Sequence, residues 1–310
     1  MQWRGRRQSS NIEDRRGSGG GFGGGMGGLG RGRLPINLPG GSRTAGGGIG
    51  IGTIVVLLVI AWLLGINPFS LLGMTGGGGL QFPSPSSSES AGQSGTPGDD
   101  GGQFVATVLA DTEDTWNQIF QGAGRTYSEP TLVLFTGRTQ SGCGFASAAT
   151  GPFYCPADQK VYIDLGFYRE LRDRFNAPGD FAEAYVIAHE VGHHVQNLLG
   201  ILPRVNQQRS RVGQAESNEL SIRVELQADC FAGLWAQHSA KVGAVEDGDL
   251  QEAINAAAAV GDDNIQRQTQ GYVVPESFNH GTSEQRMRWF KQGLAASSIA
   301  ACDTFQGSSL

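Results

Sequence analysis

The hydrophobic positions of the chain follow two different patterns. In the run GGGIGIGTIVVLLVIAWLLGINPF, from Gly46 to Phe69, apolar residues follow one another without a charge. Its apolar centre, Ile49 to Ile66, offers no polar face, and its eighteen residues would span about 27 Å as a helix. The hydrocarbon layer of a membrane is about 30 Å thick. The pattern predicts a transmembrane signal anchor over residues 46–70, in contact with the lipid bilayer.

From Phe104 onward the apolar residues are spaced as in folded helices and strands. Helical spacing predicts a first amphipathic helix from Phe104 to about Gly122, and the runs TLVLF, CGFASAATGPFYC and KVYID predict short strands. Capping and breaking residues bound further helices, which we expect at 167–175, 180–200, 218–239, 249–260 and from Thr282 onward, with Asp180 as an N-cap. The expected fold class is therefore α+β, with a small sheet between helices.

Glycine divides the chain into parts that fold and parts that do not. Thirty of the 49 glycines lie in residues 1–103, and segments so poor in apolar side chains cannot bury a core. We expect a disordered Arg/Gly-rich arm at 1–45 and a flexible Gly/Ser/Pro linker at 71–103. Residues 104–310 are long enough for a single folded domain.

The arginines of the first segment predict an orientation for the anchor. Residues 1–43 carry eight arginines against Glu13 and Asp14, and they directly precede the apolar run. The positive-inside rule then predicts a single-pass membrane protein with a cytoplasmic N-terminus and residues 104–310 outside. Arginine-glycine segments can also bind RNA, but this position favours a topology signal, and we expect no nucleic-acid partner.

Four cysteines, Cys143, Cys155, Cys230 and Cys302, all lie in the expected domain and form no CxxC pair. Two disulfides fit an oxidising compartment, whereas four free thiols would indicate a reducing one. Three connectivities are possible. We favour a bond between Cys143 and Cys155, which closes a short loop, and one between Cys230 and Cys302, which ties the C-terminal tail to a central helix.

The stretch AEAYVIAHEVGHHVQNLLG carries metal-binding chemistry. His189 and His193 stand four residues apart, so a helix presents both imidazoles on one face to one ion, at about 2.0–2.1 Å. Glu190 is rotated by about 100° and can address a water molecule at that ion. This is the HExxH pattern of zinc peptidases. Two surface histidines are the plain alternative, and His194 points away from the ligand face.

A third ligand is expected in RVELQADCFAGLWAQH, where Glu225 and Asp229 again stand four apart on a helix. Unpaired carboxylates would be costly in so apolar a segment. We therefore assign Glu225 as the third zinc ligand. Asp229 is assigned as the acceptor of the spare N–H of a ligating histidine. The alternative is solvated surface charge.

Together, HEVGHHVQN, ELQADCFAGLWA and HGTSEQRMRWF resemble the neutral zinc metallopeptidase family of the YpfJ type, over most of the chain. The HExxH pattern with a distal glutamate in an ExxAD context is also similar to the gluzincins. The resemblance implies a minimal gluzincin-like domain made of an active-site helix, a glutamate helix and a small antiparallel sheet. It further implies one zinc ion and a peptide or protein substrate.

The same comparison implies roles for two later residues. His280 would donate a hydrogen bond to the developing oxyanion, and Arg286 would hold a carboxylate near the metal, although glycine follows His280 where the related element has proline. An exposed histidine in a capping loop and an arginine in a structural ion pair are the alternative. An edge strand, at Phe145–Ala149 or Val161–Asp164, would pair with extended substrate.

The expected function is that of a membrane-anchored zinc-dependent metallopeptidase with Glu190 as general base. One alternative is a non-catalytic, zinc-containing anchored scaffold, although a purely structural site has no use for Glu190. The other is a zinc hydrolase that acts on a cell-wall amide or ester. No pattern in the sequence indicates the oligomeric state.

Overall fold

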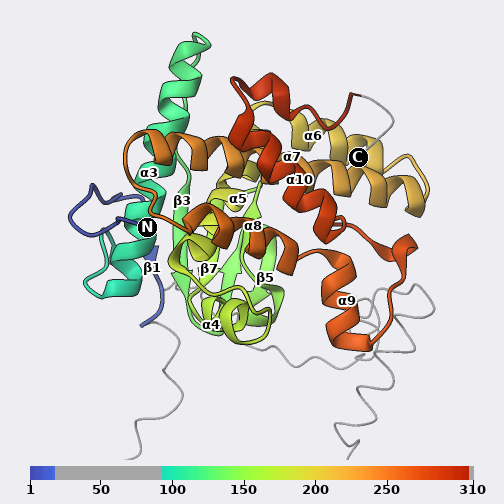
Figure 1. Cartoon of the computed structure of the whole chain (residues 1–310), viewed down its shortest axis with the longest axis horizontal. Coiled ribbons are helices and arrows are strands. Elements are labelled where there is room, and N and C mark those ends of the chain that lie inside the picture. The colour runs from blue at the N-terminus through green and yellow to red at the C-terminus, as the bar shows by residue number, and fades with distance from the viewer. Residues whose placement is uncertain (18–92, 307–310) are drawn as a thin grey trace, which may run out of the picture. The chain divides into compact units, whose positions relative to one another are not determined.

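The computed structural model describes residues 1–17 and 93–306, all of which belong to one compact unit. Most of this unit is helical, with one mixed sheet and a separate two-stranded hairpin (Figure 1). Residues 46–70, the expected transmembrane anchor, lie outside the described ranges. Within those ranges no helix has both the length and the apolar character needed to cross a membrane. The expected fold, a small antiparallel sheet behind a transmembrane helix, is wrong for the described part of the chain. Its main sheet is mixed, and none of its helices can cross a membrane.

The main sheet has five strands in the order β2-β1-β3-β7-β6. They are β1 (Ile12–Asp14), β2 (Gln93–Ser94), β3 (Thr131–Phe135), β6 (Phe153–Cys155) and β7 (Lys160–Asp164). Strand β3 is parallel to both β1 and β7, whereas β2 and β6 pair antiparallel with their neighbours. The sheet is mixed because β7 is parallel to β3 and antiparallel to β6. Strand β1 comes from the start of the chain, which the sequence pattern left out of the fold.

The first residues of the chain are the main correction to the expected domain boundaries. Residues 1–45 were expected to be a disordered arm, yet Ile12 of β1 is buried between β2 and β3. Strand β2 and the start of the next helix likewise lie inside the expected linker 71–103. Strand β1 is hydrogen-bonded to both β2 and β3, so residues from both of these segments belong to the folded unit.

The helices agree with the sequence pattern except at two places. They are α3 (Asp100–Gly122), α4 (Gly166–Asp173), α5 (Asp180–Leu198), α6 (Ile201–Arg209), α7 (Gln214–Lys241), α8 (Asp249–Ala259), α9 (Asp262–Gln270) and α10 (Ser283–Ala295). Helices α6 and α9 were not expected. The capping box of Thr282 and Gln285 at the start of α10 is confirmed. Asp180 is the first residue of α5 rather than its N-cap, which is Gly179.

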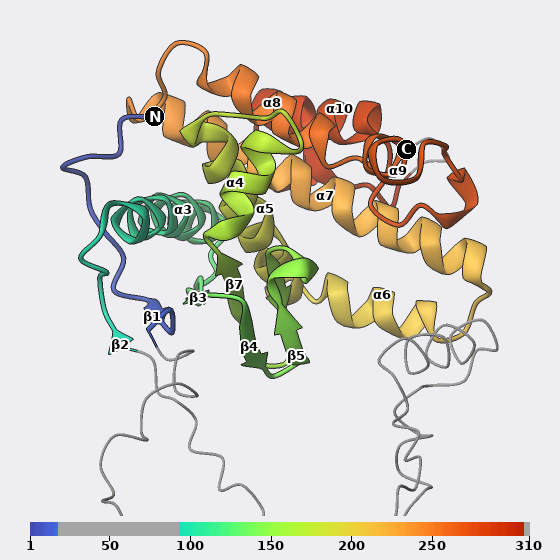
Figure 2. The ribbon, with the colours of Figure 1, turned by 90° about the horizontal axis from the view of Figure 1, so that it is seen from below.

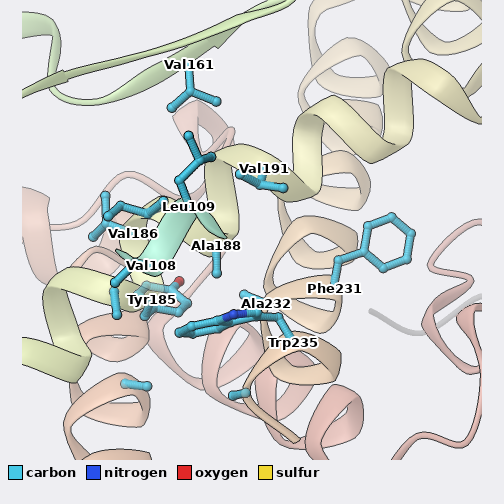
Figure 3. Packing of buried hydrophobic residues seen from close by; sticks show 14 of the residues in the cluster. Val108, Leu109, Val161, Tyr185, Val186, Ala188, Val191, Phe231, Ala232 and Trp235 are labelled. Carbon is cyan, nitrogen blue, oxygen red and sulfur yellow. The ribbon is translucent and has the colours of Figure 1, made fainter. Parts of the chain in front are cut away.

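Helix α5 lies at the centre of the unit, between the sheet and helices α7 and α8 (Figures 1 and 2). Figure 3 shows side chains of α5 surrounded by Val161 of β7, Leu109 of α3 and Trp235 of α7, all of them fully buried. A helix enclosed in this way is held on several faces. Side chains on α5 and its neighbours are therefore positioned with little freedom.

Small residues let the helices around α5 approach closely. A Cβ atom on Gly192 of α5 would stand 3.1 Å from the carbonyl oxygen of Ala228 on α7. Between α7 and α10, a Cβ on Gly233 would collide with the backbone of Phe290, and one on Gly293 would collide with the backbone of Cys230. These contacts fix how close α7 lies to both α5 and α10.

Replacing Gly233 by alanine is expected to lower the free energy of unfolding by about 1–3 kcal/mol, because the added methyl group meets backbone that cannot rotate away. Chemical denaturation of the two proteins measures the difference. Gly213, the N-cap of the same helix, has no atom near its Cβ position, so Gly213→Ala should lose only the N-cap preference for glycine over alanine, about 0.5–1 kcal/mol. Equal effects at the two positions would contradict the close helix crossing.

Both favoured disulfides are confirmed, Cys143 with Cys155 and Cys230 with Cys302. The first closes a loop of 12 residues between the hairpin, made of β4 (Arg138–Ser141) and β5 (Gly144–Ser147), and strand β6. The second joins α7 to a short 3₁₀ helix, Ile299–Cys302, across 72 residues. It anchors the C-terminal tail at the residue that follows Asp229.

Candidate metal centre

His189 and His193 of α5 and Glu225 of α7 bring their side chains to one point. The Nε2 atom of His189 stands 3.2 Å from one Glu225 carboxylate oxygen, and the Nε2 atom of His193 stands 3.5 Å from the other. Ligands held at 2.0–2.1 Å in a tetrahedron around zinc would be about 3.3 Å apart. The three side chains therefore have the spacing of a zinc site, as the sequence pattern predicted.

The opposite ring nitrogen of each histidine is held by another side chain. The Nδ1 atom of His189 lies 2.9 Å from the Asp229 carboxylate, and the Nδ1 atom of His193 lies 2.8 Å from the side-chain oxygen of Gln196. Gln196 is held in turn by its own amide, which donates to the Val224 carbonyl at 2.7 Å. With Nδ1–H donated in each ring, both Nε2 lone pairs face the same point. This arrangement fits a metal ion.

Asp229 is fully buried and is the centre of a charged network. Its carboxylate accepts from the Tyr185 hydroxyl and from Nε and Nη2 of Arg286, at 2.8 and 3.0 Å. Burial alone would raise the pKa of Asp229, but Arg286 and His189 outweigh it and hold the pKa below the usual value. The carboxylate that orients His189 is thus kept ionised by a guanidinium from α10, in agreement with the role expected for Arg286.

The balance between burial and neighbouring charges also sets the protonation of the possible ligands. Burial would raise the pKa of Glu225, but the imidazoles of His193 and His189 hold it well below the usual range. For His189, burial lowers the pKa, whereas the carboxylates of Asp229 and Glu225 outweigh it and raise the pKa to about 9. An anionic ligand set of this kind attracts a proton or a cation, so a metal ion must displace that proton to bind.

Glu190 is buried beside the three converging side chains and lines the same cavity, whose volume is about 560 Å³. Burial raises the pKa of its carboxyl above the usual value, and the imidazoles of His193 and His189 act in the opposite direction. A carboxylate with a raised pKa is a better proton acceptor. The position and the pKa both suit a general base.

His280 also lines this cavity, and its ring is held from behind by Asp262. The Nδ1 atom of His280 lies 3.0 Å from Oδ1 of Asp262, whose other oxygen accepts the backbone N–H groups of Asn279, His280 and Gly281. Asp262 is the first residue of α9. The loop before α10 is therefore bound to the start of α9, with the imidazole directed to the cavity.

Three residues of the centre were not found from the sequence: Tyr185, Gln196 and Asp262. Gln196 follows His193 by three residues on the same helix, so helical spacing could have indicated it. Asp262 stands 18 residues before its partner and has no such signal. His194, expected to point off the ligand face, is buried away from the cavity, where it contacts the Tyr154 hydroxyl and the Ser128 carbonyl.

Two imidazoles and one carboxylate on neighbouring helices, open to a cavity, are typical of the metal centres of zinc-dependent enzymes. The comparisons agree with this class. The model of the family described as "Putative neutral zinc metallopeptidase" matches residues 1–305, and the chain belongs to this family. The family name implies zinc and a peptide or protein substrate.

The chain is similar to proteins of two bacteria. It is 49% identical to "Uncharacterized protein YpfJ" of Escherichia coli strain K12 over 306 residues, which cover 98% of this chain and 99% of the relative. It is 42% identical over 224 residues to "Uncharacterized protein Rv2575" of Mycobacterium tuberculosis, covering 69% of this chain and 75% of the relative. No solved structure matches the chain.

Proposed function

We propose that this protein hydrolyses peptide bonds with one zinc ion held by His189, His193 and Glu225. The observation that carries the proposal is the convergence of these three side chains, with both histidine Nδ1 atoms already engaged. The gluzincin pattern of the sequence supports the same assignment, because the third ligand comes from a second helix. Membrane anchoring forms no part of this proposal.

The residues around the proposed ligands have separate roles in the reaction. Zinc in such a site acts as a Lewis acid on a carbonyl group and on a water molecule. Glu190 accepts the proton of the attacking water and passes it to the leaving amine, and its raised pKa favours the first of these transfers. Asp229 and Arg286 keep the ring of His189 in one orientation throughout.

His280 can supply a hydrogen bond to the oxyanion, but only in one protonation state. Its Nδ1 atom faces Asp262, so the neutral ring carries its proton there and leaves Nε2 bare. The imidazolium form carries a proton on both nitrogens. Burial lowers the pKa of His280, but the Asp262 hydrogen bond and the Glu225 charge outweigh it and raise the pKa. Asp262 thereby extends the pH range in which His280 can donate.

Replacing Asp262 by asparagine is expected to shift the alkaline limb of kcat/KM to lower pH. A group with a raised pKa is protonated below that pKa and loses its proton as the pH rises through it, so a lower pKa ends the donating range earlier. A pH profile of the parent and of Asp262→Asn measures the shift. Asp263→Asn, at the next position of α9, is the matched control. Coincident profiles of Asp262→Asn and the parent would show that His280 takes no part.

The cavity indicates the kind of peptide that fits. Its walls are largely apolar and include Pro152, Phe153, Phe167, Phe175, Leu202 and Ile265. Arg286 is the only arginine or lysine among the described residues that line it, and Asp229 holds that guanidinium. We therefore expect cleavage of internal peptide bonds next to large apolar residues, since no free arginine or lysine is offered to a terminal carboxylate.

Strand β6 is the best placed to bind extended substrate. It forms the outer edge of the described sheet, and Phe153 and Tyr154 line the cavity. Of the two segments expected from the sequence, Val161–Asp164 is excluded, because β7 is paired on both sides. Phe145–Ala149 includes most of β5, which pairs with β4 in the separate hairpin. Addition of a peptide strand to β6 would place its backbone along the metal centre.

The two disulfides support an oxidising compartment for the folded unit. We accordingly propose that the metal centre works outside the cytoplasm. On this proposal residues 1–16 lie on the same side as the metal centre, and the pairing of β1 with β3 supports this.

Removing zinc is expected to abolish hydrolysis of a peptide that is blocked at both ends and has an apolar residue at its centre, and adding zinc back should restore it. Metal analysis should find one zinc per chain. If zinc is bound but neither blocked peptides nor unfolded casein are cleaved, the centre is structural, as in the scaffold alternative. Release of amines from cell-wall material without peptide cleavage would favour the cell-wall alternative.

A further inference from the structure

The first sixteen residues form an extended strap, Met1–Arg16, over the folded unit. At one end the α-amino group of Met1 contacts the carboxylates of Asp180, Glu246 and Asp249 at 2.8, 2.9 and 3.0 Å. At the other end lies strand β1. Few apolar side chains anchor the strap, namely Met1, Trp3 and Ile12. Most of its remaining contacts are polar.

The arginines of the strap pair with acidic residues of the folded unit. Arg6 reaches Asp111, and Arg7 reaches Glu113 and Asp114 on the same helix, α3. Further along, Arg16 contacts Asp99 just before that helix. Several of these pairs are partly exposed, so each contributes little and is screened by salt. Release of the strap would detach β2, whose only neighbour in the described sheet is β1, but would leave β3, β7 and β6 paired.

The ammonium contact joins the strap to the two helices that carry the metal centre. Asp180 is the first residue of α5, which bears His189, and Asp249 is the first residue of α8. The carbonyl of Val260, which follows α8, accepts from Arg286, the partner of Asp229. The same contact therefore fixes one end of the helix that supplies two ligands and one end of the helix that supports their orientation.

The acidic cluster at this point could otherwise hold a cation. Carboxylate oxygens of Asp180, Asp249 and Glu252 lie within 4.8 Å of one another. Here the ammonium group of Met1 lies against Asp180 and Asp249, while Glu252 accepts the backbone N–H of Phe181, the second residue of α5. Without the strap, these negative charges at the helix starts would face one another uncompensated.

We propose that the strap is a separable positioning element of the metal centre. When the strap is docked, it holds the starts of α5 and α8 in place relative to each other. When it is released, the zinc site becomes looser. The carboxylates that the Met1 ammonium group contacts are those of Asp180, Glu246 and Asp249, none of them a proposed zinc ligand, so this contact acts on the metal centre through the two helices. This inference goes beyond the proposed hydrolysis and is tested by zinc affinity and by protease protection, neither of which depends on turnover.

The first experiment cuts the full chain without mutating the strap. A recognition sequence for a specific protease, inserted between residues 18 and 92, allows the zinc-loaded protein to be nicked. We expect the strap fragment to co-elute with the folded unit at low salt, and to dissociate at high salt with a loss of zinc affinity of about tenfold, the effect of losing a supporting contact. If the strap dissociates while zinc affinity in the same high-salt buffer equals that of the uncut protein, the coupling is absent.

The second experiment releases the strap by mutation. Ile12→Asp places a charge in the buried slot of β1 and should make the bonds after Arg6 and Arg7 at least about tenfold more sensitive to trypsin, with a parallel loss of zinc affinity. A synthetic peptide of residues 1–16 should restore the affinity. Arg211→Ala, at an exposed position between α6 and α7, is the control. Faster cleavage with unchanged zinc affinity, or cleavage no faster than in the parent, would overturn the proposal.

Asp249→Asn tests the effect of the ammonium contact independently of the docking of β1. It removes the buried partner of Met1 and leaves the strand pairing intact. We expect weaker zinc binding with the bonds after Arg15 and Arg16, which follow β1, still protected, and recovery in Asp249→Glu, which restores the charge. Equal zinc affinities in the parent and Asp249→Asn would show that the ammonium contact does not reach the metal centre.

Discussion

Glu190→Gln is expected to retain zinc and to lose about 10²–10⁴-fold in kcat, the usual contribution of a general base. The amide has nearly the same shape as the carboxylate, and Glu190 is not one of the three converging ligands. Its removal therefore takes away the proton acceptor and leaves the site intact. Steady-state hydrolysis of a blocked apolar peptide, together with metal analysis of the same sample, measures both parts of the prediction.

The matched control is Glu183→Gln, two turns earlier on α5. Glu183 is also partly buried, and burial raises the pKa of its carboxyl to about 7. It does not line the cavity, so this variant should hydrolyse peptide at the parent rate. Full activity in Glu190→Gln would remove Glu190 from the base role. Loss of zinc from that variant would instead make Glu190 part of the ligand set.

Arg286→Met is expected to lower the free energy of unfolding by about 3–5 kcal/mol, because it leaves the buried carboxylate of Asp229 without its cation. Zinc affinity should fall by about 10–100-fold, since Asp229 then no longer orients His189 reliably. Denaturation curves and competition with a chelator give the two values. Arg288→Met, at an exposed position of the same helix, should change neither.

A double variant separates the effect on stability from the effect on zinc affinity. Asp229→Asn combined with Arg286→Met removes the uncompensated charge, so much of the stability should return while zinc affinity stays low. The loss of stability in the double variant would then be smaller than the sum of the two single losses, which shows that the two residues are coupled. If Arg286→Met were no less stable than Arg288→Met, the guanidinium would not be balancing Asp229.

The two histidines of the proposed ligand set could be inferred from the sequence because their geometry is local. A spacing of four on a helix brings His189 and His193 to one face whatever surrounds them. Glu225 needed a second helix at the correct distance, which the sequence indicated only through a carboxylate in an apolar segment and through the family resemblance. That distance depends on Gly192 against Ala228, a contact that no single helix reveals.

The missed elements have weak local signals or distant partners. Helix α9, DDNIQRQTQ, contains one apolar residue, Ile265, and α6 has Pro203 in its first turn, so neither shows helical periodicity. Strand β1 has three residues among arginines, and only pairing with β3 more than a hundred residues later makes it a strand. The mixed sheet and the true boundaries of the folded unit therefore could not be inferred from local pattern.

The place of β1 in the sheet also constrains the order of assembly. Strand β1 is synthesised before its sheet neighbours β2 and β3. Met1 is likewise synthesised long before its partner Asp249. Arg286 and Cys302 arrive last, and both act on α7 beside Glu225. On the proposed function, a growing chain would hold no complete metal centre until α10 and the C-terminal tail have packed on α7, and activity would begin only then.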